Sequence, residues 1–172
     1  MSKYSIPLGL KKVATLCVLK HKQQFLLLKR LKEPNQGLFT PVGGKLDPFE
    51  SPLQSAIRET HEETGIKVDQ MKYCGMLTES SPTKYNWVGY VDLAEIDFVP
   101  PPPCNEGELH WISFEEVLNV PTPKTDWYLY QYILQNKPFA FHAAFDEQLQ
   151  LLELHEEIED KLVYSIQSEI KA

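Results

Sequence analysis

The stretch around residues 52–64 carries a complete set of helix start and stop signals, and it constrains the fold more than any other part of the chain. Ser51 can cap a helix, Pro52 suits the first helical position, and Gln54 completes a Ser-x-x-Gln capping box. Gly65 supplies the left-handed residue that ends a helix. Residues at helical spacing form a weakly apolar stripe: Leu53, Ile57, Thr60 and Thr64. The sequence therefore predicts one amphipathic helix over 52–64.

Apolar and β-branched runs on both sides of this helix predict strands. Two runs, 13–19 and 24–29, are separated by His21-Lys22-Gln23 and are typical of a hairpin. Residues 38–42 are expected to be extended, because Pro41 disfavours helical backbone at Thr40. Further strands are predicted over 71–78, 88–93, 109–112 and 139–145. The four prolines at 100–103 predict an extended loop, since proline cannot donate a hydrogen bond to a sheet.

Three more helices are expected, and together with the strands they define the fold class. They are a short helix that starts at Ser113, a helix over 126–135, and an acidic terminal helix over 156–172. Strands and helices without regular βαβ alternation indicate an α+β fold, or an α/β/α sandwich with a mixed sheet. A length of 172 residues suits one domain over 1–172, with a core of about 10–155 and a helical appendage over about 156–172.

Charge and cysteine content exclude several classes of function. The chain has 17 basic and 24 acidic residues, so it lacks the electrostatic footprint of a protein that binds a nucleic-acid backbone. The three cysteines, Cys17, Cys74 and Cys104, are few and far apart, which argues against a disulfide framework or a zinc site. The longest aliphatic run, Phe25–Leu28, is too short to span a membrane. We expect a cytoplasmic protein without a nucleic-acid or membrane partner, and the sequence leaves its oligomeric state open.

Three carboxylates of the predicted helix share one face. Glu59, Glu62 and Glu63 stand at positions i, i+3 and i+4, and Arg58 can relieve only part of their mutual repulsion. A divalent cation would remove the conflict, because Mg²⁺ prefers oxygen ligands and typically binds carboxylates together with substrate phosphates. The alternative is a solvated acidic face, which is the usual role of charged runs.

The residues before the helix decide between these alternatives. Gly43-Gly44-Lys45 forms a flexible turn at which backbone can approach a ligand closely. Over 23 positions the chain resembles the Nudix box, with matching residues at the box spacing: Gly44, Glu50, Arg58, Glu59, Glu62, Glu63, Gly65 and Ile66. One position departs from the pattern: Thr60 stands where an aliphatic residue is preferred.

This resemblance implies a Nudix fold and the metal-dependent hydrolysis of a diphosphate linked to another moiety. The metal, Mg²⁺ or Mn²⁺, would be held by the Gly43 carbonyl and by four carboxylates, those of Glu59, Glu62, Glu63 and Glu106. Glu106 is preferred to Glu108 because the family's additional acid lies a few residues before a Trp, here Trp111. Arg58 and Glu50 would pair to fix the loop against the helix. One glutamate would act as general base on water, and the sequence does not decide which.

Outside the box, residues from about 13 to 145 resemble oxidised-purine nucleoside triphosphatases, the 8-oxo-dGTP diphosphatase branch. That branch releases a nucleoside monophosphate and pyrophosphate. The resemblance implies six substrate-binding residues: Lys29, Phe39, Thr40, Lys45, Asp126 and Trp127. Phe39 and Trp127 would stack on a base, and packing in the core is the alternative for both. Lys45 would contact phosphate, or be simply solvated.

Two positions depart from that branch. Thr40 stands where the branch can use an Asn to read the purine edge, and only Asp126 remains of an acidic pair before the late Trp. Two other functions are therefore kept. ADP-ribose hydrolysis is the runner-up, suggested by Pro82, which lies 16 residues beyond Ile66, although a lone proline in such a stretch is far more often just a turn. The other function is that of a non-catalytic nucleotide sensor, but every acid of the box is present and no basic helix-turn-helix follows.

Overall fold

The structure of the protein is a computed structural model that describes residues 7–171. These residues form eleven strands and three helices. The strands of the first half are β1 (Lys12–His21), β2 (Gln24–Arg30), β3 (Phe39–Thr40), β4 (Val42–Lys45), β5 (Lys72–Ser80) and β6 (Trp87–Glu95). Those of the second half are β7 (Pro103–Cys104), β8 (Gly107–Ser113), β9 (Phe139–Phe145), β10 (Leu151–Glu156) and β11 (Lys161–Ser165). The helices are α1 (Pro52–Thr64), α2 (Lys124–Leu134) and α3 (Ile166–Ile170).

The strands form one mixed sheet. Its order is β11-β10-β9-β5-β6-β1-β2-β8-β7, with β3 paired to β2 and β4 paired to β1. The β1–β6 and β5–β9 pairs are parallel, and the other pairs are antiparallel. Mixed pairing with long connections confirms the predicted α+β class, since parallel neighbours need crossovers that hairpins do not provide.

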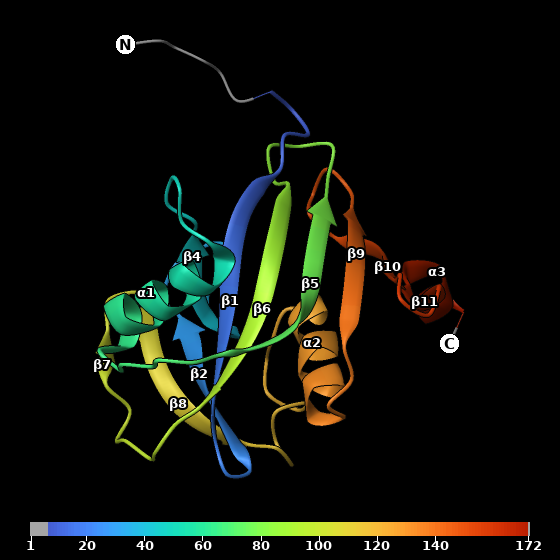
Figure 1. Cartoon of the computed structure of the whole chain (residues 1–172). Coiled ribbons are helices and arrows are strands. Elements are labelled where there is room, and N and C mark those ends of the chain that lie inside the picture. The colour runs from blue at the N-terminus through green and yellow to red at the C-terminus, as the bar shows by residue number, and fades with distance from the viewer. Residues whose placement is uncertain (1–6, 172) are drawn as a thin grey trace.

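Alternating side chains give the sheet two apolar faces. Cys17 and Leu19 of β1 pack in the cluster that contains Ala56 of α1. Val18, between them, packs in the other cluster, which contains Leu129 of α2. Because neighbouring residues of a strand point to opposite faces, α1 and α2 cover opposite sides of the sheet. Figure 1 shows α1 beside β4, α2 alongside β5 and β9, and β10, β11 and α3 at the edge farthest from α1. The predicted α/β/α sandwich is therefore confirmed.

β1 and β2 pair only near their turn and then diverge, and this divergence positions Gly43 and Gly44. β1 pairs with β2 only over Leu19–His21, whereas Ala14–Cys17 pair with β4 instead. The continuous segment from β3 to β4 fills the opening, which places Gly43 opposite Leu16 and Gly44 opposite Thr15. The two glycines thus lie against the middle of the sheet, directly under α1.

The chain's C-terminal end corrects one prediction. The helix expected over 156–172 is wrong for most of its length, because β10 ends at Glu156, β11 follows, and only α3 is helical. The buried Glu156 carboxylate accepts hydrogen bonds from the backbone N–H groups of Ala140, Ile158 and Glu159 (2.8–3.1 Å). The side chain of this last residue of β10 therefore binds the backbone of the turn before β11, and it is not part of a solvated helix face.

Two smaller predictions are also corrected. The short helix expected at Ser113 is a run of turns over 114–119, since prolines 121 and 123 leave no room for a continuing helix. The stripe expected on α1 does not bury Leu53, which is 45% exposed; the buried residues are Ser55, Ala56, Thr60 and Thr64. Within residues 7–171, none of the helices is both long and apolar enough to cross a membrane.

Candidate active site

Helix α1 begins and ends where its sequence signals place it. The Ser51 hydroxyl accepts from the Gln54 N–H (3.2 Å), and the Gln54 side chain accepts from the Ser51 N–H (2.9 Å). Gly65 adopts φ 71°, the left-handed conformation, and its N–H donates to the His61 carbonyl (2.8 Å). These contacts fix where the acidic face of α1 lies relative to the preceding loop.

Arg58 joins that loop to the helix. Its guanidinium donates to both oxygens of Glu50 (2.8 and 2.9 Å) and to the Lys45 carbonyl (3.1 Å). It also reaches the carboxylates of Glu59 (2.8 Å) and Glu62 (3.2 Å). These hydrogen bonds hold the pKa of Glu50 down at about 2. Arg58 and Glu50 have the paired geometry that the sequence predicts, and Arg58 offsets part of the repulsion among the acids.

Glu59 and Glu63 lie directly on the two glycines. The Gly43 N–H donates to Oε2 of Glu63 (3.2 Å). The Glu59 carboxyl lies so close over Gly44 that a Cβ at that position would stand 2.4 Å from it. Burial, together with the charges of Glu59 and Glu106, raises the pKa of Glu63 to about 7. The arrangement therefore concentrates negative charge that Arg58 does not neutralise.

Glu106 and Glu108 occupy different surroundings. Glu106 lies in the turn between β7 and β8, and its charge contributes to the raised pKa of Glu63. Glu108 is exposed and contacts the His110 ring nitrogen Nε2 (3.3 Å). This geometry supports the choice of Glu106. Among the described residues, no group of three carboxylate, imidazole or thiol side chains lies close enough to hold a metal ion. Two of the predicted ligands, Glu59 and Glu62, are instead hydrogen-bonded to Arg58.

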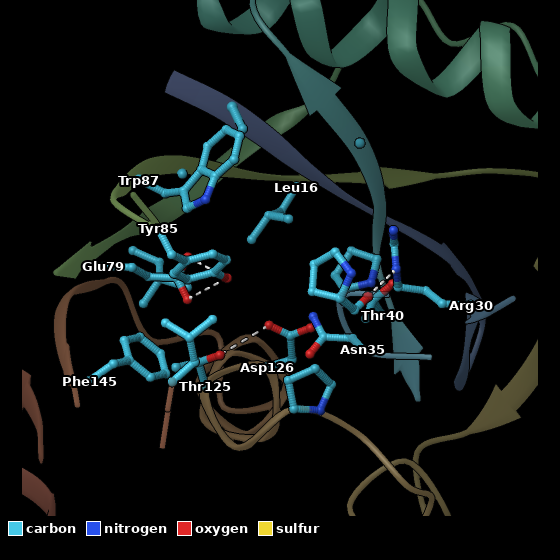
Figure 2. A pocket seen from close by; sticks show the side chains of 18 of the residues that line it. Leu16, Arg30, Asn35, Thr40, Glu79, Tyr85, Trp87, Thr125, Asp126 and Phe145 are labelled. Carbon is cyan, nitrogen blue, oxygen red and sulfur yellow. Dashed lines mark hydrogen bonds between the residues drawn. The ribbon is translucent and has the colours of Figure 1, made fainter. Parts of the chain in front are cut away.

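On the other side of the same glycines lies a cavity of about 690 Å³. Its walls come from β1, β4, β5, β6 and β9, from the first turn of α2, and from the loop before β3 (Figure 2). Gly43 and Gly44 line the cavity and also contact the box acids. The acidic helix and the cavity thus adjoin at these two glycines.

Two acidic side chains point into this cavity, and burial raises the pKa of both carboxyl groups. Asp126 is 7% exposed, and its one hydrogen bond among the described residues is a long one, from the Thr125 hydroxyl (3.5 Å). Burial raises the pKa of Asp126 to about 8, and the charge of Glu79 adds to the rise. Burial also raises the pKa of Glu79 to about 7, against the hydrogen bond from the Tyr85 hydroxyl (3.3 Å). Figure 2 shows both carboxyl groups facing the cavity.

The structure brings together some of the predicted substrate residues and separates others. Thr40, Lys45 and Asp126 line the cavity. Lys29 is exposed beside a smaller hollow of about 230 Å³. Phe39 packs edge-on against His110 (5.6 Å), and Trp127 donates its indole N–H to the Leu118 carbonyl (3.0 Å). Lys29, Phe39 and Trp127 are not among the residues that line the larger cavity.

Glu79 and Tyr85 were not predicted as site residues. One signal was present for Glu79: it follows Leu77 by two residues in β5, so it lies on the same, buried face of the strand. A carboxylate on a buried strand face is rarely without a role, because its burial is costly. Tyr85 carried no comparable signal, since its position depends on the loop between β5 and β6.

Comparisons with known proteins identify the family. A sequence model of the NUDIX domain matches residues 10–134. The chain is 27% identical over 136 residues to the uncharacterized Nudix hydrolase YvcI of Bacillus subtilis, covering 76% of this chain and 84% of that one. It is 26% identical over 141 residues to the oxidized purine nucleoside triphosphate hydrolase of Mus musculus, covering 78% of this chain and 86% of that one.

Structural comparison shows which fold the chain shares. The crystal structure of a mutator MutT protein from Bacillus halodurans matches with a TM-score of 0.74 and 24% identity, covering 86% of this chain and 98% of that one. The chain therefore belongs to the Nudix family and shares the fold of MutT proteins. It is an enzyme of the Nudix pyrophosphohydrolase type, with all acids of the box in place.

Proposed function

We propose that this enzyme hydrolyses an oxidised purine nucleoside triphosphate, 8-oxo-dGTP or a close relative, to the nucleoside monophosphate and pyrophosphate. The observation that carries the proposal is the continuity of the cavity with the box at Gly43 and Gly44. A volume of about 690 Å³ is in the usual range for a small-molecule site. A base in the cavity would leave its phosphates beside the box acids. Such a reaction would clear damaged nucleotides, and the three free cysteines suit the reducing cytoplasm.

The chemistry of the donor set fits a hard divalent cation, Mg²⁺ or Mn²⁺. Burial first, and then the charges of Glu59 and Glu106, raise the pKa of Glu63, and a cation beside these acids would favour their ionised forms. The residues that would hold it are Gly43, through its carbonyl, and Glu59, Glu62, Glu63 and Glu106. When bound, the cation would polarise phosphoryl oxygens and lower the pKa of the attacking water.

The chain's own residues supply the remaining steps. Arg58 keeps the loop and the acids of α1 in a fixed relation. A glutamate of the box takes the proton of the attacking water as general base. Thr40, Lys45 and Asp126 are the first candidates for substrate contacts because they line the cavity. At neutral pH a protonated Asp126 can donate a hydrogen bond to a carbonyl or ring nitrogen of the base.

A turnover panel tests the proposal. We would measure kcat/KM for 8-oxo-dGTP, the four ordinary deoxynucleoside triphosphates and ADP-ribose, with Mg²⁺ and with EDTA, and identify products by chromatography. A preference of about tenfold or more for 8-oxo-dGTP, with monophosphate and pyrophosphate released, is the expected result.

Two other outcomes would redirect the proposal. Preference for ADP-ribose would replace the substrate and leave the acid site in place, although Pro82 lies exposed in a turn, away from the cavity lining. No turnover of any compound would favour the nucleotide-sensor hypothesis.

A further inference from the structure

The cavity holds an acid that the Nudix box does not explain. Glu79 stands on β5, on the opposite side of the two glycines from α1, and it makes no ion pair within residues 7–171. Both of its oxygens accept from the Tyr85 hydroxyl, at 3.5 and 3.3 Å. Glu79 is half-buried, and a partly desolvated carboxyl that retains free acceptor positions is costly unless a ligand uses them.

Resting on the proposed function, we infer that Glu79, oriented by Tyr85, determines base specificity by accepting the N–H donors of a purine that carries a 2-amino group. The same purine without that amino group would be a poor substrate. The site would therefore read the amino-bearing edge of the base as well as any oxidised position.

Tyr85 is held firmly enough to orient its partner. Its carbonyl accepts from the Ser81 hydroxyl (2.7 Å), and its N–H donates to the Thr83 hydroxyl (3.0 Å). Its ring packs edge-on against Trp87 and Phe145, with centroids 6.3 and 5.9 Å apart. A hydroxyl fixed in this way restricts the rotation of the Glu79 carboxyl, and preorganised groups lose less entropy when a ligand binds.

A second, independent observation indicates that a polar ligand belongs here. Asp126 reaches the cavity from α2, is 7% exposed, and has no hydrogen bond to Oδ2 among the described residues. Thr40, in the same lining, has a buried hydroxyl without a partner in residues 7–171. Together with Glu79 of β5, these two groups come from three different elements and line one cavity (Figure 2).

The chemistry of the groups identifies the edge that they fit. An ionised carboxylate only accepts hydrogen bonds, whereas a protonated carboxyl can also donate one. A 2-amino-6-oxopurine presents two adjacent N–H donors beside a carbonyl. Glu79 can accept from the donors and Asp126 can donate to the carbonyl. Removing the amino group leaves an acceptor of Glu79 unpaired in a buried place, which is the kind of mismatch that polar sites reject most strongly.

The test compares substrates that differ only in the 2-amino group. We would measure kcat/KM for dGTP against dITP, and for their 8-oxo forms, in the wild-type enzyme and in Glu79→Leu, Tyr85→Phe and Glu33→Leu. We expect a wild-type preference of about 10²-fold for the amino-bearing base. Glu79→Leu should reduce the ratio to about twofold, and Tyr85→Phe, which keeps the acid, should give an intermediate ratio. Glu33→Leu removes an exposed acid at the cavity rim and should keep the wild-type ratio.

A binding measurement separates this inference from the proposed function. Calorimetry with dGMP and dIMP reports the base preference even if no triphosphate is hydrolysed, and we expect dGMP to bind at least about tenfold more tightly. Equal affinities in the wild-type protein, or an unchanged preference in both Glu79→Leu and Tyr85→Phe, would overturn the inference. Loss of turnover with the binding preference retained would overturn only the proposed function.

Discussion

The acids on the two sides of Gly43 and Gly44 are held in opposite ways. On the α1 side, Glu50 and Glu59 accept short hydrogen bonds from Arg58, and Glu63 accepts one from backbone. On the cavity side, Asp126 has one long contact and Glu79 is bonded to a neutral hydroxyl. The guanidinium of Arg58 orders the first set and holds the pKa of Glu50 at about 2, whereas burial without a neighbouring cation raises the pKa of Glu79 to about 7 and that of Asp126 to about 8. Glu63, which Arg58 does not contact, has a pKa raised to about 7 as well.

This contrast indicates a division of labour within one site. Several ordered carboxylates around a glycine turn suit a cation and its phosphates, while partly protonated acids that line a cavity suit a neutral base that needs both donors and acceptors. If the division is real, substitutions on the α1 side should lower turnover of every substrate. Substitutions on the cavity side should instead change which substrate is preferred, or how the protein responds to pH.

The largest expected effect comes from Glu63→Gln. The change keeps the shape of the side chain but removes a charge beside Gly43, so kcat should fall on the order of 10²–10⁴-fold while KM changes little. Steady-state kinetics with Mg²⁺ would measure both. His61→Gln, at an exposed position of the same helix, is the matched control and should be close to wild type. Near-normal turnover by Glu63→Gln would contradict the assignment of catalysis to the acids on the α1 side.

A smaller loss is expected from Gly44→Ala. The new Cβ would meet the Glu59 carboxyl at 2.4 Å, and because that carboxyl ends a flexible side chain, the protein should fold with Glu59 displaced. We expect kcat to fall about 10–100-fold, with the base preference retained. Gly43→Ala is the contrasting variant: its Cβ would lie 2.0 Å from the Thr15 carbonyl oxygen at φ 152°, so it should impair folding. Thermal unfolding and kinetics together distinguish the two. A Gly44→Ala enzyme with full activity would show that Glu59 need not lie there.

The same contrast explains which parts of the site were predictable from sequence. Ser51, Gln54 and Gly65 act on residues three or four positions away, so local pattern was enough to place α1 and its acids. The cavity depends on the sheet order that brings β5 beside β9 and above α2. Tyr85 and Asp126 are 41 positions apart in the sequence and line the same cavity only because of that strand order, which no local pattern predicts.

The C-terminal end shows the same limit in a stronger form. Acidic composition after residue 156 predicted a helix, but Glu156 is bound to the N–H of Ala140, 16 residues earlier. A long-range hydrogen bond thus overrode the local preference, and β10 and β11 extend the sheet instead. Trp127, predicted to stack on a base, donates to the Leu118 carbonyl for a similar reason: its surroundings are set by the preceding loop.

On the cavity side, Asp126→Asn should change how stability depends on pH. The folded protein keeps a proton on Asp126 up to about pH 8, whereas the unfolded chain releases it above about pH 4. The free energy of unfolding should therefore fall as pH rises between these values, with a slope of up to ~1.4 kcal/mol per pH unit from this group. Asn cannot titrate, so the variant should lose this contribution and retain that of Glu79.

Urea unfolding at pH 5, 6, 7 and 8 would measure both slopes. Asp69→Asn is the control, because that side chain is exposed and makes no ion pair among the described residues. Parallel curves for wild type and Asp126→Asn would show that Asp126 is ionised when folded, and would remove the contrast between the two sides.

The smallest expected effect lies at the rim where the two sides meet. Two lysines approach the ring of Trp87, Lys12 at 5.3 Å and Lys45 at 5.9 Å from its centroid, but only Lys45 lines the cavity. If Lys45 contacts phosphate, Lys45→Met should raise KM about two- to fivefold, and Lys12→Met should not. The effect should shrink at high salt because exposed charges are screened. Equal KM changes in both variants would assign the effect to Trp87 packing and leave phosphate recognition entirely to the α1 side.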